Sequence, residues 1–577
     1  MVILSCWHSK PSFRPKPFVT FAPAIILFCS VAITSLSAQT NGPSKPESDV
    51  IRGTVVNSQT HEPIGHALVY SPDNRFATMT DDRGRFQFNL SQLDSQASSS
   101  YVVRHPFADR PYTLMARKPG FLPPGNRQPI PVTGETQSDF TISLVPEALI
   151  VGRVLIPGAD GFDRIQVELF CRTIQEGAER WQSWGTIMSR SNGEFRFAEL
   201  QPGSYKLVTH ELLDRDPLSF NPRGQLFGYP PVYYPSGTDF EAASVIQLSS
   251  GAMFVASISP VRREYYAVKI KLANAAANLP IDIQVWPQGH PGPGYALGHN
   301  ETEQLIQGSL PDGYYFVQVS SYGPTAMNGA SDLLVKGAAV EGQTVALLPN
   351  VSIPVSVHEE FQLQETLAQV SAPETNLRVK GRPRYLQVNL RPVENYGPPW
   401  GAASMRQPQN PQDDSPLVIE NVHPGRYRVQ VNTPVGFASS ITSGGIDLLN
   451  LPLAVPAGGA ISPIEITLRD DGAEVEGAVE NANSPGSSQQ SQGQVYFVPV
   501  AGNNGQFRVA WLSPEGKFQL HQLPPGAYRV LAFNHPESDL EYQNAEAMSK
   551  YDSKAQILRV TPGQKAHLRL QFITADD

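Results

Sequence analysis

The stretch Phe518-Gln-Leu-His-Gln-Leu-Pro-Pro-Gly-Ala-Tyr-Arg-Val-Leu-Ala532 decides the fold of this chain. Apolar residues alternate with polar ones on both sides of the Pro-Gly pair, as in two strands that each bury one face. Proline presets φ for a turn, and the glycine after it accepts the positive φ that a type II turn needs. The tyrosine two residues later resumes the alternation, with its ring inward and its hydroxyl able to reach a backbone group. The stretch therefore predicts a β-hairpin.

The same hairpin pattern occurs three more times. The earlier copies read Phe195-Arg-Phe-Ala-Glu-Leu-Gln-Pro-Gly-Ser-Tyr-Lys-Leu207, Leu305-Ile-Gln-Gly-Ser-Leu-Pro-Asp-Gly-Tyr-Tyr-Phe-Val317 and Leu417-Val-Ile-Glu-Asn-Val-His-Pro-Gly-Arg-Tyr-Arg-Val429. The turn glycines Gly203, Gly313, Gly425 and Gly526 stand 110, 112 and 101 residues apart, by subtraction of those numbers. A period of about 100 residues suits one small β-sandwich per repeat, whereas solenoid repeats have about 20 to 50 residues. A hairpin cannot bury one face alone, so each copy implies a surrounding sandwich.

The rest of the sequence supports an all-β chain. Its 52 prolines and 46 glycines are spread along the whole length, as many short strands joined by turns require. Long helical patterns are absent, and the one helix that we expect is short and lies near 544–550. The predicted fold class is all-β: a tandem array of about five Ig-like or transthyretin-like β-sandwich modules after an N-terminal signal segment.

The repeats also predict the domain boundaries. We expect a signal peptide at 1–38, a linker at 39–49, and five β-sandwiches at 50–146, 147–258, 259–353, 354–470 and 471–577. The sequence does not fix the exact boundary between the third and fourth modules. Because the linkers are very short, the rigid modules are expected to form an extended rod rather than a compact globule.

Four motifs of the first module carry a family resemblance. They read Val50-Ile-Arg-Gly-Thr-Val-Val56, Pro63-Ile-Gly-His-Ala-Leu-Val-Tyr70, Ala77-Thr-Met-Thr-Asp-Asp-Arg-Gly-Arg-Phe-Gln-Phe88 and Tyr112-Thr-Leu-Met-Ala-Arg-Lys-Pro-Gly-Phe121. In this order they resemble the carboxypeptidase regulatory-like domain family. The pattern returns more weakly in the later modules, although the first module has an insert at 91–105 where the others have Pro-Gly-x-Tyr. The resemblance implies a transthyretin-like β-sandwich without catalytic residues.

Fibronectin type III is the rival fold, because Leu-x-Pro-Gly followed by Tyr also occurs there. The Gly-x-Phe-x-Phe strand that precedes the turn favours the transthyretin-like fold.

The first residues predict export. Lys10, Arg14 and Lys16 form a basic region, the stretch 18–36 is mostly apolar, and small residues follow at 35–38. The predicted location is therefore the periplasm, the outer surface or the exterior. The apolar run is nearly long enough to span a bilayer, so an uncleaved N-terminal anchor is the alternative.

Charge and cysteine content narrow the class of protein further. The formal net charge is −9, and it becomes −12 once 1–38 is removed with its three basic and no acidic residues. An acidic exported chain without basic clusters is a poor partner for nucleic acid or anionic lipid, so we expect no nucleic-acid partner and no membrane insertion beyond the signal segment. The exported chain keeps only Cys171, and it must be stabilised by sandwich cores rather than by disulfides.

No catalytic or metal-binding motif is present in the sequence. None of the twelve histidines has a glutamate three residues later, and the chain has no His-Glu-x-x-His, no Gly-x-Ser-x-Gly and no phosphate-binding loop. His61 and His66 are expected to be solvated loop residues, and the acidic stretches 81–84 and 470–472 to be turns. We therefore expect no enzyme activity, no cofactor and no metal.

Aromatic residues on loops are the candidates for ligand binding. Flat aromatic rings with flanking polar groups bind sugars in β-sandwich modules, by fold-level analogy. The candidate residues in the two Pro-rich loops are Tyr229, Tyr233, Tyr234, Tyr396 and Trp400, with Trp181 and Trp184 as further candidates. The alternative is that these rings pack against neighbouring prolines or modules.

The sequence as a whole predicts an exported, non-enzymatic binding scaffold of the envelope or exterior. Its partner would be a polysaccharide, bound through the loop aromatics. The alternative is a protein of the envelope, docked through loops or exposed edge strands.

Overall fold

Five β-sandwiches follow one another along the chain, and each encloses its own buried hydrophobic core. Strands make up 62% and helix 1% of the structure, which confirms the predicted all-β tandem array. This computed structural model describes residues 50–72, 77–89, 112–123, 130–132, 140–156, 164–214, 224–275, 280–288, 294–322, 326–362, 378–379, 382–383, 386–393, 403–406, 416–433, 435–480, 493–500, 506–513 and 515–573. The predicted signal segment lies outside these ranges. Within them, no helix is both long and apolar enough to cross a membrane.

One sheet has the same topology in every module. Its central strand is the first strand of the module: β1 (Val50–Asn57), β9 (Ala148–Val154), β18 (Arg263–Ala273), β26 (Val351–Glu360) or β37 (Ala473–Glu480). On one side it pairs in parallel with the last long strand, β8 (Phe140–Pro146), β17 (Met253–Ile258), β24 (Val340–Ala346), β36 (Ile464–Arg469) or β43 (Lys565–Ile573). On the other side it pairs antiparallel with β4 (Arg85–Asn89), β12 (Glu194–Leu200), β21 (Leu305–Pro311), β31 (Val418–Val422) or β40 (Lys517–Leu523). Five copies of one strand order support tandem repetition of a single fold.

The second sheet of each module is also built around one antiparallel pair. These pairs are β2 (Leu68–Tyr70) with β5 (Tyr112–Arg117), β10 (Gln166–Gln175) with β13 (Gly203–Thr209), β19 (Ile281–Pro287) with β22 (Gly313–Ser321), β29 (Gln387–Pro392) with β32 (Gly425–Asn432), and β38 (Gln494–Pro499) with β41 (Gly526–Phe533). The two sheets enclose the core of each module.

The remaining strands complete the sheets or join them. They are β3 (Ala77–Met79), β6 (Phe121–Leu122), β7 (Ile130–Val132), β11 (Ala178–Met188), β14 (Leu212–Leu213), β15 (Leu226–Tyr229), β16 (Ile246–Leu248), β20 (Gly298–Asn300), β23 (Met327–Val335), β25 (Leu348–Pro349), β27 (Arg378–Val379), β28 (Arg382–Pro383), β30 (Ala403–Ser404), β33 (Phe437–Ser443), β34 (Ile446–Asp447), β35 (Leu453–Val455), β39 (Arg508–Trp511) and β42 (Gln556–Val560). The helix α3 (Ala545–Ser549) forms where a short helix was predicted, and the Asn544 side chain caps it by accepting from the backbone N–H groups of Glu546 and Ala547.

The repeated tyrosine anchors each predicted hairpin in the same way. Its hydroxyl donates to the backbone carbonyl four residues earlier. The four bonds are Tyr205 to Gln201 (2.7 Å), Tyr315 to Pro311 (2.8 Å), Tyr427 to His423 (2.9 Å) and Tyr528 to Pro524 (2.6 Å). All four rings are buried. The predicted inward ring with a hydroxyl bonded to backbone is therefore confirmed.

The backbone of the turn differs from the predicted type II geometry. A type II turn places its glycine near φ +80°, but the turn glycines of the first, third and fourth hairpins have φ between 154° and 159°. The left-handed residue instead lies in the strand before the turn, where the pairing register shifts: Glu199, Asn421 and Gln522 have φ of 57°, 56° and 57°. A β-bulge in the first strand, rather than a left-handed glycine in the turn, redirects the chain.

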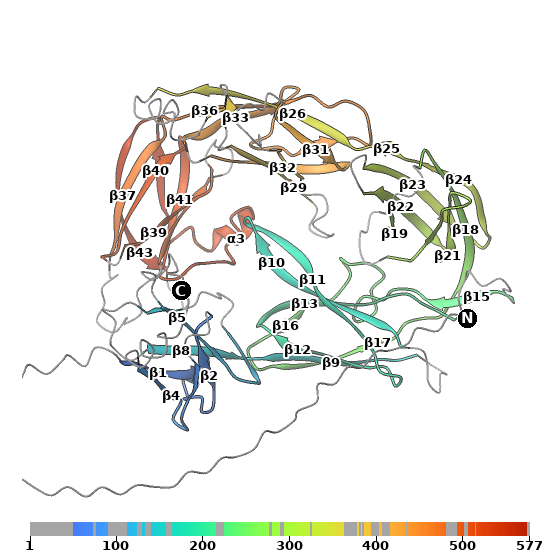
Figure 1. Cartoon of the computed structure of the whole chain (residues 1–577), viewed down its shortest axis with the longest axis horizontal. Helices are drawn as coiled ribbons and strands as arrows, with labels where there is room; N and C mark the ends of the chain where they lie inside the picture. Colours follow the sequence, from blue (N-terminus) through green and yellow to red (C-terminus); the bar gives the residue numbers. More distant parts are fainter. Residues whose placement is uncertain are drawn as a thin grey trace, which may run out of the picture.

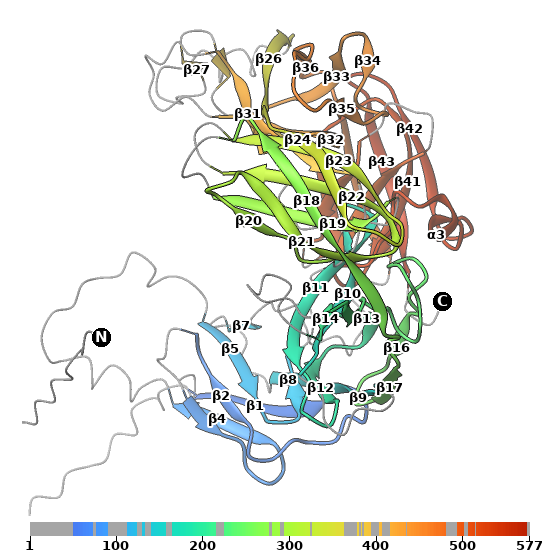
Figure 2. The same ribbon diagram turned by 90° about the vertical axis from the view of Figure 1, so that its right-hand side faces the viewer.

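Modules 2 to 5 curve into a ring and module 1 projects from module 2, so the extended rod expected from the short linkers is wrong (Figures 1 and 2). In modules 2 to 5 the sheet with the first and last strands lies on the outside, and the second sheet lines the inside. The joints are hydrogen-bonded. Gln201 Nε2 donates to Pro123 O (3.0 Å), β15 pairs with β18, Asn328 Nδ2 lies 3.0 Å from His423 Nδ1, and Gln506 Nε2 donates to Ala438 O (2.5 Å). Contacts at the joints, rather than linker length, set the angle between neighbouring modules.

Candidate functional site

Of the loop tyrosines proposed from the sequence, Tyr233 lies in a second apolar cluster of module 2, whereas Tyr229 and Tyr234 pack against the main core of that module. Tyr233 is 4% exposed, and its ring packs edge-on to Phe240 at 6.1 Å. Burial raises the pKa of its hydroxyl well above the ordinary value. Tyr234 packs edge-on to Phe254 at 5.9 Å, and Tyr229 is half-buried in β15. Glycan binding by these three residues stays a prediction, and in this conformation Tyr233 offers no free ring face.

The remaining predicted aromatics divide into two groups. Tyr396 and Trp400 lie outside the described residues. Of the two tryptophans of β11, Trp181 is buried in the same cluster as Tyr233, whereas Trp184 is 42% exposed and touches Phe197.

In modules 2 and 5, the inner sheet has an apolar face that points toward the centre of the ring. In each module, another segment of the same chain covers this face. In module 2, Phe170 and Val208 of that face lie beneath Tyr233 and Phe240 of an insertion. In module 5, the corresponding face lies beneath a segment that contains α3. The buried residues of that second cluster are Tyr496, Val498, Leu531, Phe533, Leu540, Met548 and Ile573. Covered apolar faces of this kind are ordinary packing.

In module 3 the inner face of the same sheet is aromatic, with two exposed and two half-buried side chains. We call Trp286, Tyr314, Phe316 and Leu334 the aromatic surface. Trp286 and Phe316 are opposite each other on β19 and β22, with ring centroids 5.4 Å apart and ring planes at 38°. Tyr314 and Leu334 are opposite each other on β22 and β23, and they are 47% and 58% exposed. In module 2 or module 5, an insertion of the chain covers the corresponding side chains.

Polar side chains border the aromatic surface. Asp332 is the β23 partner of Phe316, and its carboxylate accepts a 3.0 Å hydrogen bond from Gln288. Gln284 lies two residues before Trp286 on β19, and it donates a hydrogen bond to Asp282 at 3.0 Å. The surface therefore combines ring faces with amide and carboxylate groups at its edge.

A long hairpin of module 2 crosses the middle of the ring and contacts modules 4 and 5 (Figure 1). Its strands β10 and β11 have 10 and 11 residues, which gives a reach of roughly 34 Å at about 3.4 Å per residue. The tip residues Glu176 and Gly177 both have positive φ, 54° and 75°, as in a type I′ turn. Gly177 lies against the ring of Tyr542, and the backbone N–H of Gln543 donates to Gly177 O at 3.0 Å.

Ion pairs hold the hairpin on both neighbouring modules. Arg172 pairs with Glu179 of its own hairpin at 2.9 Å and with Glu541 of module 5. On module 4, Arg391 Nε lies 3.6 Å from Glu176 Oε1, and Gln430 donates to the other carboxylate oxygen. The contacts between modules join residues more than 200 positions apart in the chain.

The surroundings of Arg172 and Glu541 favour the charged form of both side chains. Burial opposes ionisation of Glu541, but hydrogen bonds from Arg172 and Asn544 hold the pKa of that carboxyl below its ordinary value. Burial likewise opposes the charge on Arg172, and its two glutamate partners raise its pKa all the same. The salt bridge is therefore formed over the whole neutral range of pH.

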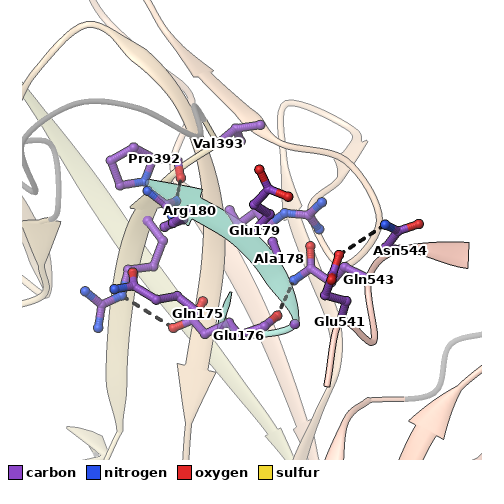
Figure 3. Close-up of a pocket in the computed structure, with 13 residues that line it drawn as sticks. Gln175, Glu176, Ala178, Glu179, Arg180, Pro392, Val393, Glu541, Gln543 and Asn544 are labelled. Atoms are coloured by element: carbon purple, nitrogen blue, oxygen red, sulfur yellow. Dashed lines mark hydrogen bonds and ion pairs between the residues drawn. The ribbon is translucent and has the colours of Figure 1, made fainter. Parts of the chain in front are cut away.

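A polar cleft of about 620 Å³ lies between the hairpin and the two modules (Figure 3). It is lined by Gln175, Glu176, Gly177, Ala178, Glu179, Arg180, Arg391, Pro392, Val393, Arg428, Glu541, Gln543 and Asn544. Figure 3 shows Glu179, Glu541 and Asn544 on one side of the hairpin strand, and Gln175 and Glu176 at its tip. Among the residues that the structure describes, no group of three metal-ligating side chains is found here or elsewhere.

Sequence reasoning did not find this cleft. The Glu-Gly turn flanked by alternating residues was visible as a hairpin signal, but the residues that the tip contacts lie in other modules. No local pattern reports such a contact.

Comparisons with known proteins show only what this chain is similar to. No family model and no curated protein matches this chain. Among solved structures, it is similar to the TIE protein of Bacillus anthracis (10% identity, 74% of both chains, TM-score 0.14) and to a streptococcal ancillary pilin (10% identity, 52% of this chain and all of that one, TM-score 0.16). It is also similar to the pilus adhesin SpaC of Lactobacillus rhamnosus GG (12% identity, 52% of this chain and 42% of that one, TM-score 0.15). We transfer no ligand, partner or activity from these proteins.

Proposed function

We propose that this chain is an exported, non-enzymatic β-sandwich scaffold that binds polysaccharide through the aromatic surface of module 3. The observation that carries the proposal is the contrast between equivalent sheet faces. The apolar faces of modules 2 and 5 are covered by the chain's own insertions, whereas Tyr314 and Leu334 stay exposed beside Trp286. The resemblance of module 1 to the carboxypeptidase regulatory-like family belongs to the same proposal, since it implies no catalytic residues.

The chemistry of the aromatic surface suits a sugar. The C–H face of a pyranose packs on a flat ring, and its hydroxyl groups need donors and acceptors at the edge of that ring. Trp286 and Phe316 supply neighbouring rings, and Asp332 with Gln288 supplies the polar edge. The interspersed polar groups are less suited to an apolar protein face, which would leave them desolvated and unpaired.

Calorimetry against a panel of soluble polysaccharides tests the proposal. We expect one class of neutral glycan to bind, and Trp286→Ala or Tyr314→Ala to raise its Kd about tenfold or more, as loss of a central aromatic contact does. Trp511→Ala is the matched control, because Trp511 is 58% exposed on module 5, away from the aromatic surface. Absence of binding to every glycan, or an equal loss in the Trp511 variant, would refute this function.

The loop aromatics remain a second candidate site within the same proposal. Tyr396→Ala and Trp400→Ala, with Tyr229→Ala, Tyr233→Ala and Tyr234→Ala, are expected to weaken glycan binding if the loops contribute. Loss of binding in the Trp400 variant but not in the Trp286 variant would move the site from the sheet to the loop.

Docking of an envelope protein is the second candidate function, and one observation favours it. β17 is an edge strand of its sheet and exposes Met253 and Val255, which are 63% and 65% accessible. An exposed apolar edge strand can accept a strand from a partner. Crosslinking in the native envelope separates the candidates, because only docking requires a stable protein partner that Val255→Lys releases.

A further inference from the structure

We propose that the cleft at the tip of the β10–β11 hairpin binds an acidic sugar, whose carboxylate is held by Arg428 and Arg391. This second site is independent of the aromatic surface and takes a different class of ligand. The observation that points to it is a pair of like charges placed face to face.

Arg391 and Arg428 are directly opposite each other on β29 and β32. Their neighbours Leu390 and Val429 point into the core, so both arginines lie on the inner face of the sheet. Opposed side chains on a sheet lie about 5 Å apart at Cβ, and like charges at that distance are destabilising. An anion between the two guanidinium groups removes that cost.

The hairpin supplies such an anion to only one of the two arginines. Glu176 lies against Arg391 and accepts from Gln430, so a carboxylate is the group that this face already binds. Arg428 is exposed at the cleft wall, and across the ranges that the structure describes it forms no ion pair. One guanidinium of the pair is therefore available to a ligand from solution.

The other cleft residues select the rest of the ligand. Glu179 and Glu541 already face Arg172, and their remaining lone pairs can accept from hydroxyl groups. The amide oxygen of Gln543 can accept from a hydroxyl group, whereas its Nε2 donates to Glu176 O and the Asn544 side chain is engaged with α3 and Glu541. The three glutamates of the wall, Glu176, Glu179 and Glu541, repel a polyanion such as nucleic acid or a run of acidic residues. A ligand with one carboxylate and several hydroxyl groups fits, and a cleft of about 620 Å³ has the size of a small-ligand site.

Glu176 itself acts as a built-in competitor for this site. It has φ 54° in a tight turn, a conformation in which Asn or Gly is preferred and other residues are strained. Its side chain nevertheless occupies Arg391. A ligand carboxylate that bridges Arg391 and Arg428 has to displace or share that contact. Removing the charge of Glu176 should therefore strengthen ligand binding rather than weaken it.

Calorimetry of the exported chain with D-glucuronate and with D-galacturonate, each of which has one carboxylate, tests the inference. D-glucose and inorganic phosphate serve as the neutral and the non-sugar anion probes. We expect the acidic sugars to bind, D-glucose not to bind, and Arg428→Gln to weaken binding at least tenfold. Arg426→Gln is the matched control, because Arg426 lies two residues away on the same face of β32 but does not line the cleft. Glu176→Gln is expected to tighten binding severalfold, and binding should weaken as salt increases.

Three results would overturn the inference: no binding of either acidic sugar, equal effects of Arg428→Gln and Arg426→Gln, or weaker binding to the Glu176→Gln chain. Binding of phosphate as tightly as of the acidic sugars would overturn the assignment to a sugar. Trp286→Ala should leave acidic-sugar binding unchanged, so failure here is distinguishable from failure of the glycan site on module 3.

Discussion

The substitution Gly177→Ala is expected to release the β10–β11 hairpin and open the ring. Gly177 has φ +75°, and a Cβ built on it would meet Tyr542 Cγ and Cδ1 at 2.4 Å. Contacts below 3.0 Å do not persist, so either the tip or the Tyr542 segment must move. The ring of Tyr542 cannot retreat freely, because it is stacked on Phe507 with centroids 3.9 Å apart.

The magnitude follows from the contacts at the tip. An L-residue in the left-handed region costs about 1–2 kcal/mol relative to glycine. Displacing the tip also breaks two hydrogen bonds, from the backbone N–H and from Nε2 of Gln543 to the carbonyls of Gly177 and Glu176. The hairpin turn has this backbone cost whether it is docked or released, so the docking equilibrium shifts by the two lost hydrogen bonds. At about 1 kcal/mol each, the shift is about 2 kcal/mol, which is a factor of roughly 30 in the population of the open form.

Small-angle X-ray scattering measures the opening as an increase in the radius of gyration. Gly337→Ala is the matched control, since Gly337 has a similar φ of +63° and nothing lies within 4 Å of its added Cβ. The Gly337→Ala variant should be destabilised only by the strain of an L-residue at positive φ, and its ring should stay closed. Adding Tyr542→Ala to Gly177→Ala relieves the clash but removes the ring packing. Scattering curves of the Gly177 and Gly337 variants that superimpose would refute the hairpin as the element that closes the ring.

Two further predictions concern buried polar groups. Burial raises the pKa of Glu211 from its ordinary 4.5 to about 7, although hydrogen bonds from Ala296 N–H at 3.3 Å and from the Tyr265 side chain act in the opposite direction. The folded chain therefore keeps a proton that the unfolded chain releases, and stability should fall by up to about 3 kcal/mol as pH rises from about 4.5 to 7. Denaturant unfolding at pH 5 and pH 8 measures this, and a Glu211→Gln chain that keeps the same pH slope contradicts it. Tyr528→Phe removes the bonds to Pro524 O and from Gln506 N–H and should destabilise module 5 by about 1–3 kcal/mol; an unchanged urea midpoint would contradict this.

The hairpins and the modules could be predicted from sequence because both are local. Alternation with period two fixes which residues of Phe518–Ala532 face inward, and Phe518, Tyr528 and Val530 are buried as that alternation requires. The tyrosine hydroxyl bonds a carbonyl only four residues away, so the same short pattern reproduces the same corner four times. The short helix near 544–550 was also local, since Asn544 caps it from its own first turn.

The turn geometry was predicted only in part. Pro-Gly indicated a reversal of the chain, but the left-handed residue is Gln522 in the preceding bulge rather than the glycine. Bulges depend on the register between two strands, and a one-dimensional pattern does not report that register.

The sequence by itself determined the modules of this protein: their all-β fold, their period of about 100 residues, and the buried tyrosine beside each turn. Only the tertiary structure decided how the modules are arranged and which of their surfaces are exposed to solvent. The ring depends on contacts such as Arg172 with Glu541, which are 369 positions apart. Whether an apolar face such as that of Trp286 or Phe170 is exposed depends on an insertion folding over it. Local patterns set the conformation of a strand, but the partner of a surface is set by distant residues whose relative positions exist only once the chain has folded.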